Sequence, residues 1–497
     1  MGIRESWVGL RSRLFADFDA SAERWGPGWL RWPVGRHGLL VAVLLVLKLA
    51  ITAWNCGVFD SITYDQGDLH VPRARDAGLG TEGRAYNPPL YYMATAPTLA
   101  VHAVADRLRD SDERLTKKQR KRRDRQLLAT LRWSNLGYLA LFYLAWIGAI
   151  LPRLIRDRRR AWIAALVLLA LPGYQKLAAM SHPDNALSSL TAVGIATWLV
   201  LRDDDRPLGR RIYLLAAAAG FVALTRPFGV LPCGALLVAC VLLLAREHGW
   251  RSRAFVTRVA GCVALTGALA GSWPAVQLAT QGGLSPVYKQ SYLEPYLPHR
   301  ADFDRVGYFS SFHVGELLTI PNRRMNQLDT VHDEFHNDYG NSFWTLLYSE
   351  TWADHWLYFS GRYQVENKAA FKRVMLAAAL PTLPLMLLGF ARGVGASVGR
   401  IRRWRDEAEA DTALFMLSFL ALGVALYLYW HLVDGLTPGK NSSVKFIYNA
   451  YLYPVALALT FVAPLRRFED RVWPAYAVAL FVISLPVVVF VPAWLIR

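Results

Sequence analysis

Cysteine is scarce in this sequence, and charged residues are fewer than in a typical soluble chain. The 497 residues include four cysteines, and 19% of the residues are Asp, Glu, Lys or Arg. About 25% of the residues of a soluble domain are charged, and small domains built on disulfides are rich in cysteine. These two shortages exclude a disulfide framework and a chain made of ordinary soluble domains.

Apolar residues are abundant and are arranged in long runs. Hydrophobic residues make up 54% of the chain, and a helix needs about 20 mainly apolar residues to cross a bilayer. Eleven segments come close to this length: 38–54, 133–151, 161–179, 186–201, 212–224, 228–246, 257–275, 372–392, 412–433, 449–463 and 473–494. The pattern predicts an all-α polytopic protein of the cell (inner or plasma) membrane.

Basic loops predict the orientation. If residues 88–106, which open with Pro-Pro, do not cross, five basic loops share the cytoplasmic side with the N-terminus, as the positive-inside rule requires. These loops are 156–160, 202–211, 246–253, 392–405 and 464–471. The basic segment 107–125 is then left outside, so its side stays open. Basic loops beside anionic lipid account for the net charge of +18, and no nucleic-acid partner is predicted.

Four regions follow from this topology. A cytoplasmic amphipathic N-terminus covers residues 1–37, and a transmembrane module covers 38–275 with a long first outer loop at 55–132. A large extracytoplasmic loop covers 276–371, and the C-terminal transmembrane helices cover 372–497. Ionisable residues near the outer membrane surface mark the place to look for a site.

Acidic residues gather in the first outer loop, just after the first predicted helix. Asp60, Asp65, Asp68 and His70 fall within eleven residues. A carboxylate at the membrane surface can act as a general base when burial and neighbouring charges move its pKa toward the working pH. The spacing leaves open which of the three aspartates would do so.

Several short motifs resemble one family. Asp-Gln after the first helix, His-Val-Pro-Arg-Ala at 70–74 and Asn-Pro-Pro-Leu-Tyr-Tyr at 87–92 are similar to stretches of the GT-C superfamily of polyprenyl-phosphate-sugar-dependent glycosyltransferases. The resemblance is to the branch with the lipid A aminoarabinose transferases and the protein O-mannosyltransferases. Three later fragments fit in the same order: SHPDNAL (181–187), ALTRPFGVLP (223–232) and KFIYNAYLYPVAL (445–457).

The resemblance implies a GT-C fold with about 11 transmembrane helices and juxtamembrane helices in the first outer loop. It also implies inverting transfer of a hexose or pentose from a polyprenyl-phosphate-linked donor to a lipid, glycan or protein acceptor on the extracytoplasmic face. Asp65 matches the family's first-loop catalytic carboxylate, with Asp68 and Asp60 as alternatives.

The resemblance implies further site residues. Cations would neutralise the departing phosphate, with Arg84 replacing a lysine that relatives often carry where this chain has Asn87. The residues implied for donor and phosphate binding are Arg226, Lys440, Lys445, Arg84 and Tyr448. Those implied for the acceptor and the sugar are His70, Tyr91 and Tyr92. His182 and Asp184 match the second acidic turn, although Asp184 could also be a simple helix cap.

No cofactor is required by this chemistry, and a divalent cation is an alternative. Asp65, Asp184 and Glu334 would be its ligands. His332 and His336 have the i, i+4 spacing of half a zinc site, but no third ligand is evident. Trp344, Trp352, Trp356, Tyr348 and Tyr358 fit either an interfacial belt or stacking on sugar rings.

A secondary transporter or flippase for a lipid-linked or anionic substrate is the main alternative. Such proteins are typically built from internal repeats with paired broken helices at the midplane of the membrane. No repeat is evident in this sequence, and its charged residues cluster at one face. An enzyme therefore fits the pattern better.

Overall fold

All the regular structure is helical in the part of the chain that the computed structural model describes. This part comprises residues 36–58, 90–91, 117–179, 182–281, 305–315, 342–353, 365–403, 409–433 and 449–489. The prediction of an all-α polytopic membrane protein is confirmed. The four cysteines are buried and free, as the exclusion of a disulfide framework requires.

Eight helical segments in these ranges are long and apolar enough to span a membrane. The helices that form them are α2 (Arg36–Val58), α5 (Lys117–Tyr143) with its continuations η3 (Leu144–Ile150) and α6 (Leu151–Leu154), α9 (Pro183–Asp203), α11 (Val230–His248), α12 (Arg253–Gln281), α16 (Val365–Ala379) with α17 (Thr382–Arg402), α18 (Ala410–Val433) and α21 (Arg467–Val488). Each of these segments overlaps one of the predicted spans.

The other three predicted spans are helical but shorter. Two are the single helices α10 (Ile212–Ala223) and α20 (Tyr453–Val462). The span predicted at 161–179 is broken at Leu171–Pro172 into α7 (Arg158–Ala170) and α8 (Gly173–Ala179). The prediction of one continuous span was therefore wrong here, because proline lacks a backbone N–H and obstructs the preceding turn.

A buried lysine stabilises the break between α7 and α8. Lys48 of α2 is fully buried and donates hydrogen bonds to the carbonyl oxygens of Leu169 (2.5 Å) and Leu171 (2.6 Å). An interrupted helix leaves carbonyl groups without intrahelical partners, and in a membrane interior neighbouring helices must satisfy them. Lys48 supplies that partner from a different helix.

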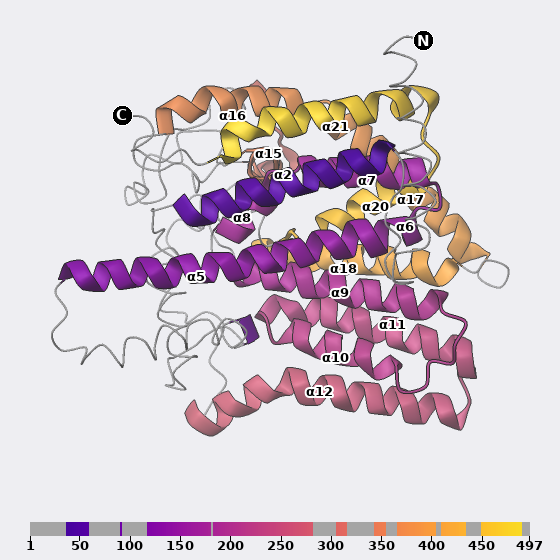
Figure 1. Ribbon diagram of the computed structural model, residues 1–497. Helices are drawn as coiled ribbons and strands as arrows, with labels where there is room; N and C mark the ends of the chain where they lie inside the picture. The colour runs from indigo at the N-terminus through magenta and orange to yellow at the C-terminus, as the bar shows by residue number, and fades with distance from the viewer. Residues whose placement is uncertain are drawn as a thin grey trace, which may run out of the picture.

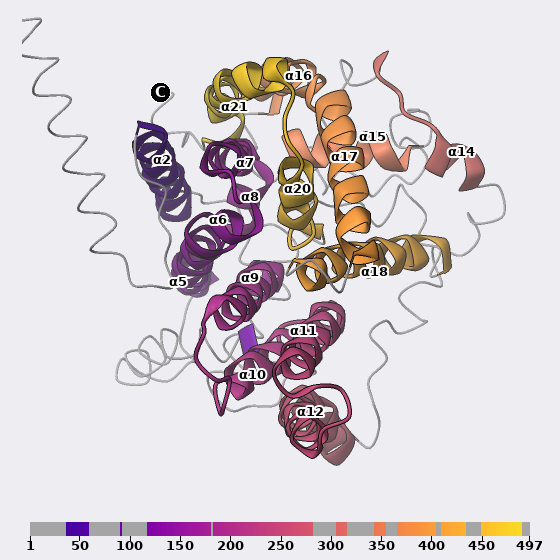
Figure 2. The ribbon, with the colours of Figure 1, turned by 90° about the vertical axis from the view of Figure 1, so that its right-hand side faces the viewer.

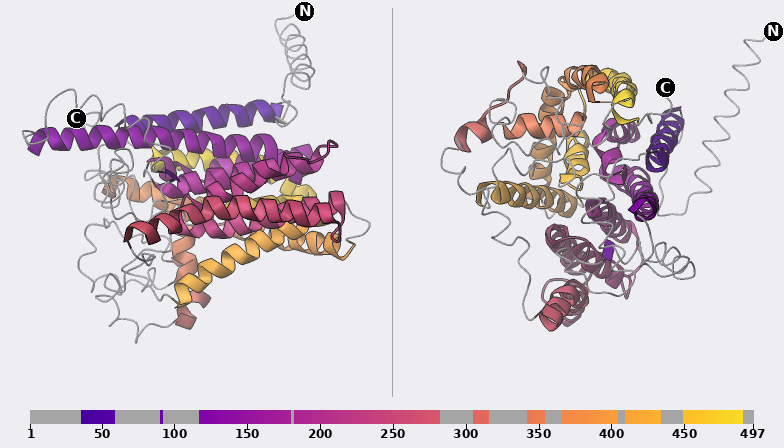
Figure 3. Two further views of the ribbon diagram at one scale, coloured as in Figure 1. Left: turned by 90° about the horizontal axis from the view of Figure 1, so that it is seen from below. Right: turned by 90° about the vertical axis from the view of Figure 1, so that its left-hand side faces the viewer.

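The long helices lie roughly side by side and run across Figure 1. We name the two ends of the bundle after the ends of α9: the His182 end, toward the left in Figure 1, and the Asp203 end, toward the right. Figure 2 views the bundle from the Asp203 end, with α10, α11 and α12 at one edge and α16 and α21 at the other. Figure 3 shows the same arrangement from below and from the His182 end.

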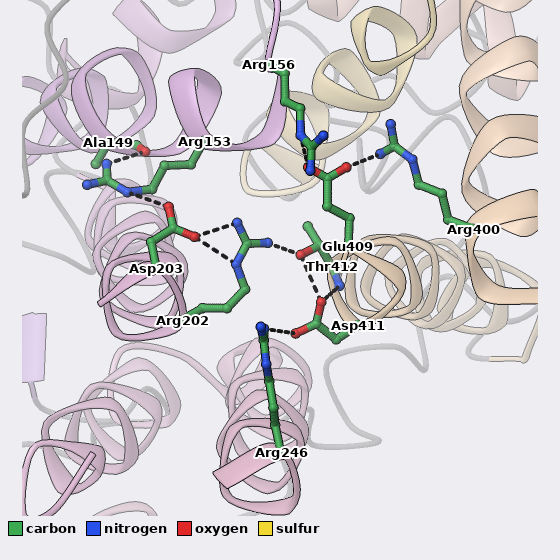
Figure 4. Close-up of polar contacts among 10 residues, drawn as sticks. All are labelled: Ala149, Arg153, Arg156, Arg202, Asp203, Arg246, Arg400, Glu409, Asp411 and Thr412. Carbon is green, nitrogen blue, oxygen red and sulfur yellow. Dashed lines mark hydrogen bonds and ion pairs between the residues drawn. The ribbon is translucent and has the colours of Figure 1, made fainter. Parts of the chain in front are cut away.

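The five basic loops lie together at the Asp203 end, as the charge pattern predicts. Polar contacts connect them: Arg153 to Asp203 (3.4 Å), Arg156 to Glu409 (2.5 Å), Arg400 to Glu409 (3.0 Å), Arg246 to Asp411 (4.0 Å), and Arg160 to the carbonyl oxygen of Val462 (2.8 Å). Figure 4 shows all but the last of these contacts, together with the hydrogen bond from Arg202 to Thr412. This network joins α6, α9 and α11 to α17 and α18.

The first two long helices run in opposite directions. Cys56 near the end of α2 contacts the carbonyl oxygen of Arg132 in α5 (3.5 Å), and Asn185 at the start of α9 donates to the carbonyl oxygen of Asn135 (2.6 Å). Thus α2 ends, and α5 begins, at the His182 end.

Candidate functional site

Three polar side chains meet at the His182 end of the bundle. His182 is the residue before α9, Asp184 lies in the first turn of α9, and Arg226 follows α10 in the turn before η4 (Pro227–Gly229). Nη1 of Arg226 donates to Oδ2 of Asp184 and lies 3.2 Å from Nδ1 of His182, which also pairs with Asp184. The structure therefore brings together three residues that the sequence singled out.

The cluster is almost completely buried. The exposed fractions are 1% for Asp184, 4% for His182 and 9% for Arg226. A buried charge is costly unless an opposite charge and hydrogen bonds compensate it. Asp184 provides that charge for Arg226, so the guanidinium is held in a fixed position.

The start of α9 explains how Asp184 reaches Arg226. Pro183 occupies the first helical turn, where its missing N–H costs nothing, and His182 is the N-cap without a side-chain capping bond. Asp184 is therefore inside the helix and is not its cap, so the helix-cap alternative is wrong. Asn185 and Ser189 donate to the carbonyl oxygens of Asn135 and Tyr138, each at 2.6 Å, and tie this turn to α5.

The Pro-Pro-Leu-Tyr-Tyr segment reaches the same place. The backbone N–H of Leu90 donates to the carbonyl oxygen of Leu224 (3.1 Å), directly before Thr225 and Arg226. Tyr91 is fully buried, and its ring centroid lies 6.2 Å from that of Tyr138 in α5. Two of the fragments that resemble the family are thus in direct backbone contact.

The described part of the C-terminal fragment, residues 449–457, also lies near this cluster. Tyr451 is 5% exposed, and its ring centroid lies 6.1 Å from that of Phe419 in α18. The hydroxyl of Tyr174 in α8 donates to the carbonyl oxygen of Ala450 (2.7 Å). The segment before α20 is therefore fixed beside the second acidic turn.

The remaining predicted site residues lie outside the described residues, and their roles stay predictions. They are Asp60, Asp65, Asp68, His70, Arg84, Tyr92, Lys440, Lys445, Tyr448 and Glu334, together with the pair His332 and His336. Within the part of the chain that the structure describes, no group of three or more His, Cys, Asp or Glu side chains could hold a metal ion. Of the three proposed cation ligands, only Asp184 is described.

Two of the three described residues of the predicted aromatic stretch are buried in the core. In α15 (Phe343–Trp352), Tyr348 is 5% and Trp352 is 3% exposed, and the hydroxyl of Tyr348 donates to the carbonyl oxygen of Leu376 (2.6 Å). Trp344 is 43% exposed, with its indole N–H donating to the carbonyl oxygen of Phe309 (2.6 Å). Stacking on a sugar therefore does not apply to Tyr348 or Trp352, whereas Trp356 and Tyr358 are outside the described ranges.

Sequence reasoning missed a second buried polar cluster. Lys176 of α8 pairs with Glu350 of α15, and Thr351 shares a hydrogen bond of 2.6 Å with the hydroxyl of Tyr453. A charged residue within an apolar run is costly in a membrane and marks a functional or structural site. Applied to Lys48 and Lys176, that rule would have singled out both residues from the sequence.

Comparison with known proteins adds one structural similarity. No protein-family model matches the chain, and no curated protein matches its sequence. Among solved structures, the chain is similar to ArnT from Cupriavidus metallidurans bound to undecaprenyl phosphate, with 15% sequence identity and a TM-score of 0.35. The match covers 89% of this chain and 78% of ArnT.

Proposed function

We propose that this chain is an integral membrane glycosyltransferase that moves a sugar from a polyprenyl-phosphate-linked donor to an acceptor on the extracytoplasmic face. One observation carries the proposal. Four fragments that resemble GT-C motifs are far apart in the sequence, yet Tyr91, Asp184, Arg226 and Tyr451 all lie at the His182 end of the bundle. Topology alone would place these turns at one end of the bundle, whereas the Arg226–Asp184 pair and the hydrogen bond from Leu90 to Leu224 bring three of the fragments into direct contact there.

The chemistry needs two charged functions. The anomeric carbon of the donor already carries a phosphate leaving group, so a base must take the proton of the incoming hydroxyl while cations stabilise the departing phosphate. Asp65 is the proposed base, with Asp68 and Asp60 as alternatives. Attack from the side opposite the phosphate forms the new C–O bond, breaks the old one and inverts the anomeric centre.

Arg226 is the proposed phosphate-binding cation. Arginine matches phosphate with a planar set of donors, and hydrogen bonds between charged partners are stronger than neutral ones. Asp184 and His182 hold its guanidinium in place before the substrate arrives. Lys440, Lys445 and Arg84 are the further cations proposed for the donor, with Tyr448 beside them.

The position of Arg226 suits a lipid-linked donor. It follows the last turn of α10, at one end of the helical bundle. A polyprenyl phosphate places its chain among lipid tails and its charged group near the membrane surface. Asp184 already binds Arg226 and His182, which favours neutralisation of the phosphate by side chains over the cation alternative at Asp65, Asp184 and Glu334.

One feature favours the transporter alternative. The interrupted α7–α8 segment and the fully buried Lys48 are of the kind that transporters use near their substrate sites. Lys48 is satisfied by the carbonyl groups of the break itself. The enzyme and the transporter differ in whether the bond between sugar and phosphate is broken.

The test measures release of free polyprenyl phosphate by purified protein in lipid vesicles, with a panel of polyprenyl-phosphate sugars and a membrane extract as the source of acceptors. Release by the wild type from one donor supports the proposed function. Asp205→Asn, an exposed change at the opposite end, serves as the matched control for changes at the site. No release from any donor, combined with movement of the intact donor across the vesicle membrane, would establish the transporter instead.

A further inference from the structure

We propose that Lys176 and Glu350 are positioning residues that fix α15 against α8, the helix that leads to the second acidic turn, and that this contact directs the sugar to the acceptor in preference to water. The inference rests on the proposed function, which it deepens. Neither residue is placed in contact with the donor. Their effect is carried by the elements that they join.

Lys176 binds the C-terminal end of α15. Its Nζ donates to the carbonyl oxygens of Ala353 (2.7 Å) and Glu350 (3.1 Å), and to Oε1 of Glu350 (3.3 Å). Both side chains are buried, with 1% exposed for Lys176 and none for Glu350. An ammonium at a helix C-terminus is favoured by the helix dipole, and its three donors match these three acceptors.

The helix that carries Lys176 leads directly to the site. α8 begins at the break that Lys48 stabilises, and the chain reaches His182 three residues after the end of α8. The hydroxyl of Tyr174, also in α8, binds the carbonyl oxygen of Ala450. α8 is therefore joined both to the second acidic turn and to the segment before α20.

α15 contacts that same segment independently. The hydroxyl groups of Thr351 and Tyr453 are 2.6 Å apart. Tyr451, two residues earlier, is buried and follows Ala450, whose carbonyl oxygen accepts the hydrogen bond from Tyr174. The last turn of α15 is thus attached, through Glu350 and Thr351, to both elements that flank the His182–Asp184–Arg226 cluster.

The contacts of α15 are expected to affect how the acceptor is placed for reaction. The loop 276–371, which contains α15, is expected on the extracytoplasmic side, where the acceptor approaches. Reaction requires the hydroxyl to lie close to the anomeric carbon, and displacements of about 1 Å can cost on the order of 100-fold in rate. Arg226 is held by His182 and Asp184 at the start of α9, whereas Lys176 and Glu350 join α8 to α15. Loosening α15 should therefore slow transfer and spare donor binding.

The decisive quantity is the partition of the donor between acceptor and water. In transfer, the bond from the anomeric carbon to the phosphate oxygen breaks and a bond to the acceptor oxygen forms. In hydrolysis, water forms that bond and free sugar is released, with the same polyprenyl phosphate as the other product. Partial unfolding lowers both routes together, whereas misplacement of the acceptor lowers only transfer.

The experiment compares wild type with Glu350→Gln, which removes the charge and keeps the two carbonyl acceptors of Lys176. Glu247→Gln, at the Asp203 end, is the matched control. The donor is the polyprenyl-phosphate sugar from which the wild type releases polyprenyl phosphate. The acceptors come from membrane extract. We expect the ratio of transfer to hydrolysis to fall about tenfold in Glu350→Gln, with the affinity for undecaprenyl phosphate unchanged and Glu247→Gln like the wild type.

Equal loss of transfer and hydrolysis, or an unchanged ratio in folded protein, would overturn the inference while leaving the proposed function intact. If the wild type releases no polyprenyl phosphate, both this inference and the proposed function are overturned. If Glu350→Gln does not fold, Thr351→Val removes only the hydrogen bond to Tyr453. That milder variant should lower the same ratio, and a ratio equal to that of the wild type would count against the inference.

Discussion

Nη1 of Arg226 donates a hydrogen bond to Oδ2 of Asp184, although 42 residues separate the two in the sequence. The pair joins the start of α9 to the turn after α10, and His182 completes the cluster. This is the place where motifs from distant parts of the chain meet. The geometry gives Arg226 a fixed position and gives Asp184 a role in holding it there.

Replacing Arg226 by glutamine should weaken binding of undecaprenyl phosphate. A hydrogen bond to a charged group contributes about 2 kcal/mol, which corresponds to ~30-fold in Kd. The affinity can be measured by titration of the protein in nanodiscs, with thermal unfolding as the check on folding. Arg206→Gln, whose side chain is 84% exposed at the Asp203 end, should bind as the wild type does. Equal affinities of the two variants for undecaprenyl phosphate would show that Arg226 does not bind the donor phosphate.

Lys48→Met should destabilise the protein. The change leaves the carbonyl groups of Leu169 and Leu171 without the ammonium that now binds them. The expected loss is about 1–3 kcal/mol of unfolding free energy for each buried group left unsatisfied. Thermal unfolding in detergent would show it as a lower Tm. The control is Leu47→Met, a substitution at the neighbouring exposed residue. An equal Tm for the two variants would contradict the role of Lys48 in stabilising the break.

The sequence and the structure agree where local pattern decides the outcome. All eleven apolar segments are helical where the structure describes them, with 161–179 divided into two helices, and Pro183 marks the start of α9 because proline is tolerated in a first turn. The apolar pattern predicts 161–179 as one span; Pro172 explains why it is broken, but nothing in the local sequence indicates that Lys48 stabilises the break. That contact joins residues 121 positions apart, and no periodicity encodes it.

The second polar cluster escaped prediction for the same reason. Glu350 stands in an aromatic stretch of a predicted loop, where a carboxylate is ordinarily solvated, but in the structure it is buried and paired with Lys176 of α8. By contrast, the meeting of His182, Asp184 and Arg226 followed from topology. Consecutive spanning helices run in opposite directions, so every second turn between them lies at the same end of the bundle.

The ionic network at the Asp203 end should contribute to stability and leave catalysis unaffected. Asp203 pairs with Arg153 and Arg202, both nearly buried, so Asp203→Asn should cost about 1–3 kcal/mol of unfolding free energy. Phosphate release by the folded variant should equal that of the wild type, because the network and the site lie at opposite ends of α9. Asp205→Asn controls for the loss of charge in this loop. A reduced rate with unchanged stability would show that the two ends are coupled.

Close helix packing leaves no room for a side chain at Gly393. A Cβ added to Gly393 in α17 would lie 1.8 Å from the carbonyl oxygen of Leu459 in α20, whereas one added to Gly395 would meet nothing within 4 Å. Small residues allow such close approach of membrane helices. Gly393→Ala should therefore destabilise the protein by about 1–3 kcal/mol, and Gly395→Ala should be neutral. Unfolding curves that coincide would show that α17 does not pack on α20 as described.

The central claim is tested most directly by comparing the Asp65→Asn variant with the wild type. Both are reconstituted in lipid vesicles with the panel of polyprenyl-phosphate sugars, and the release of free polyprenyl phosphate is measured. The substitution removes the basic oxygen and nearly preserves shape, so folding and donor binding should persist. We predict release by the wild type, loss of release in Asp65→Asn, and unchanged affinity of that variant for undecaprenyl phosphate. Release by Asp65→Asn at the wild-type rate would contradict the assignment of the base, and no release by the wild type from any donor would contradict the glycosyltransferase itself.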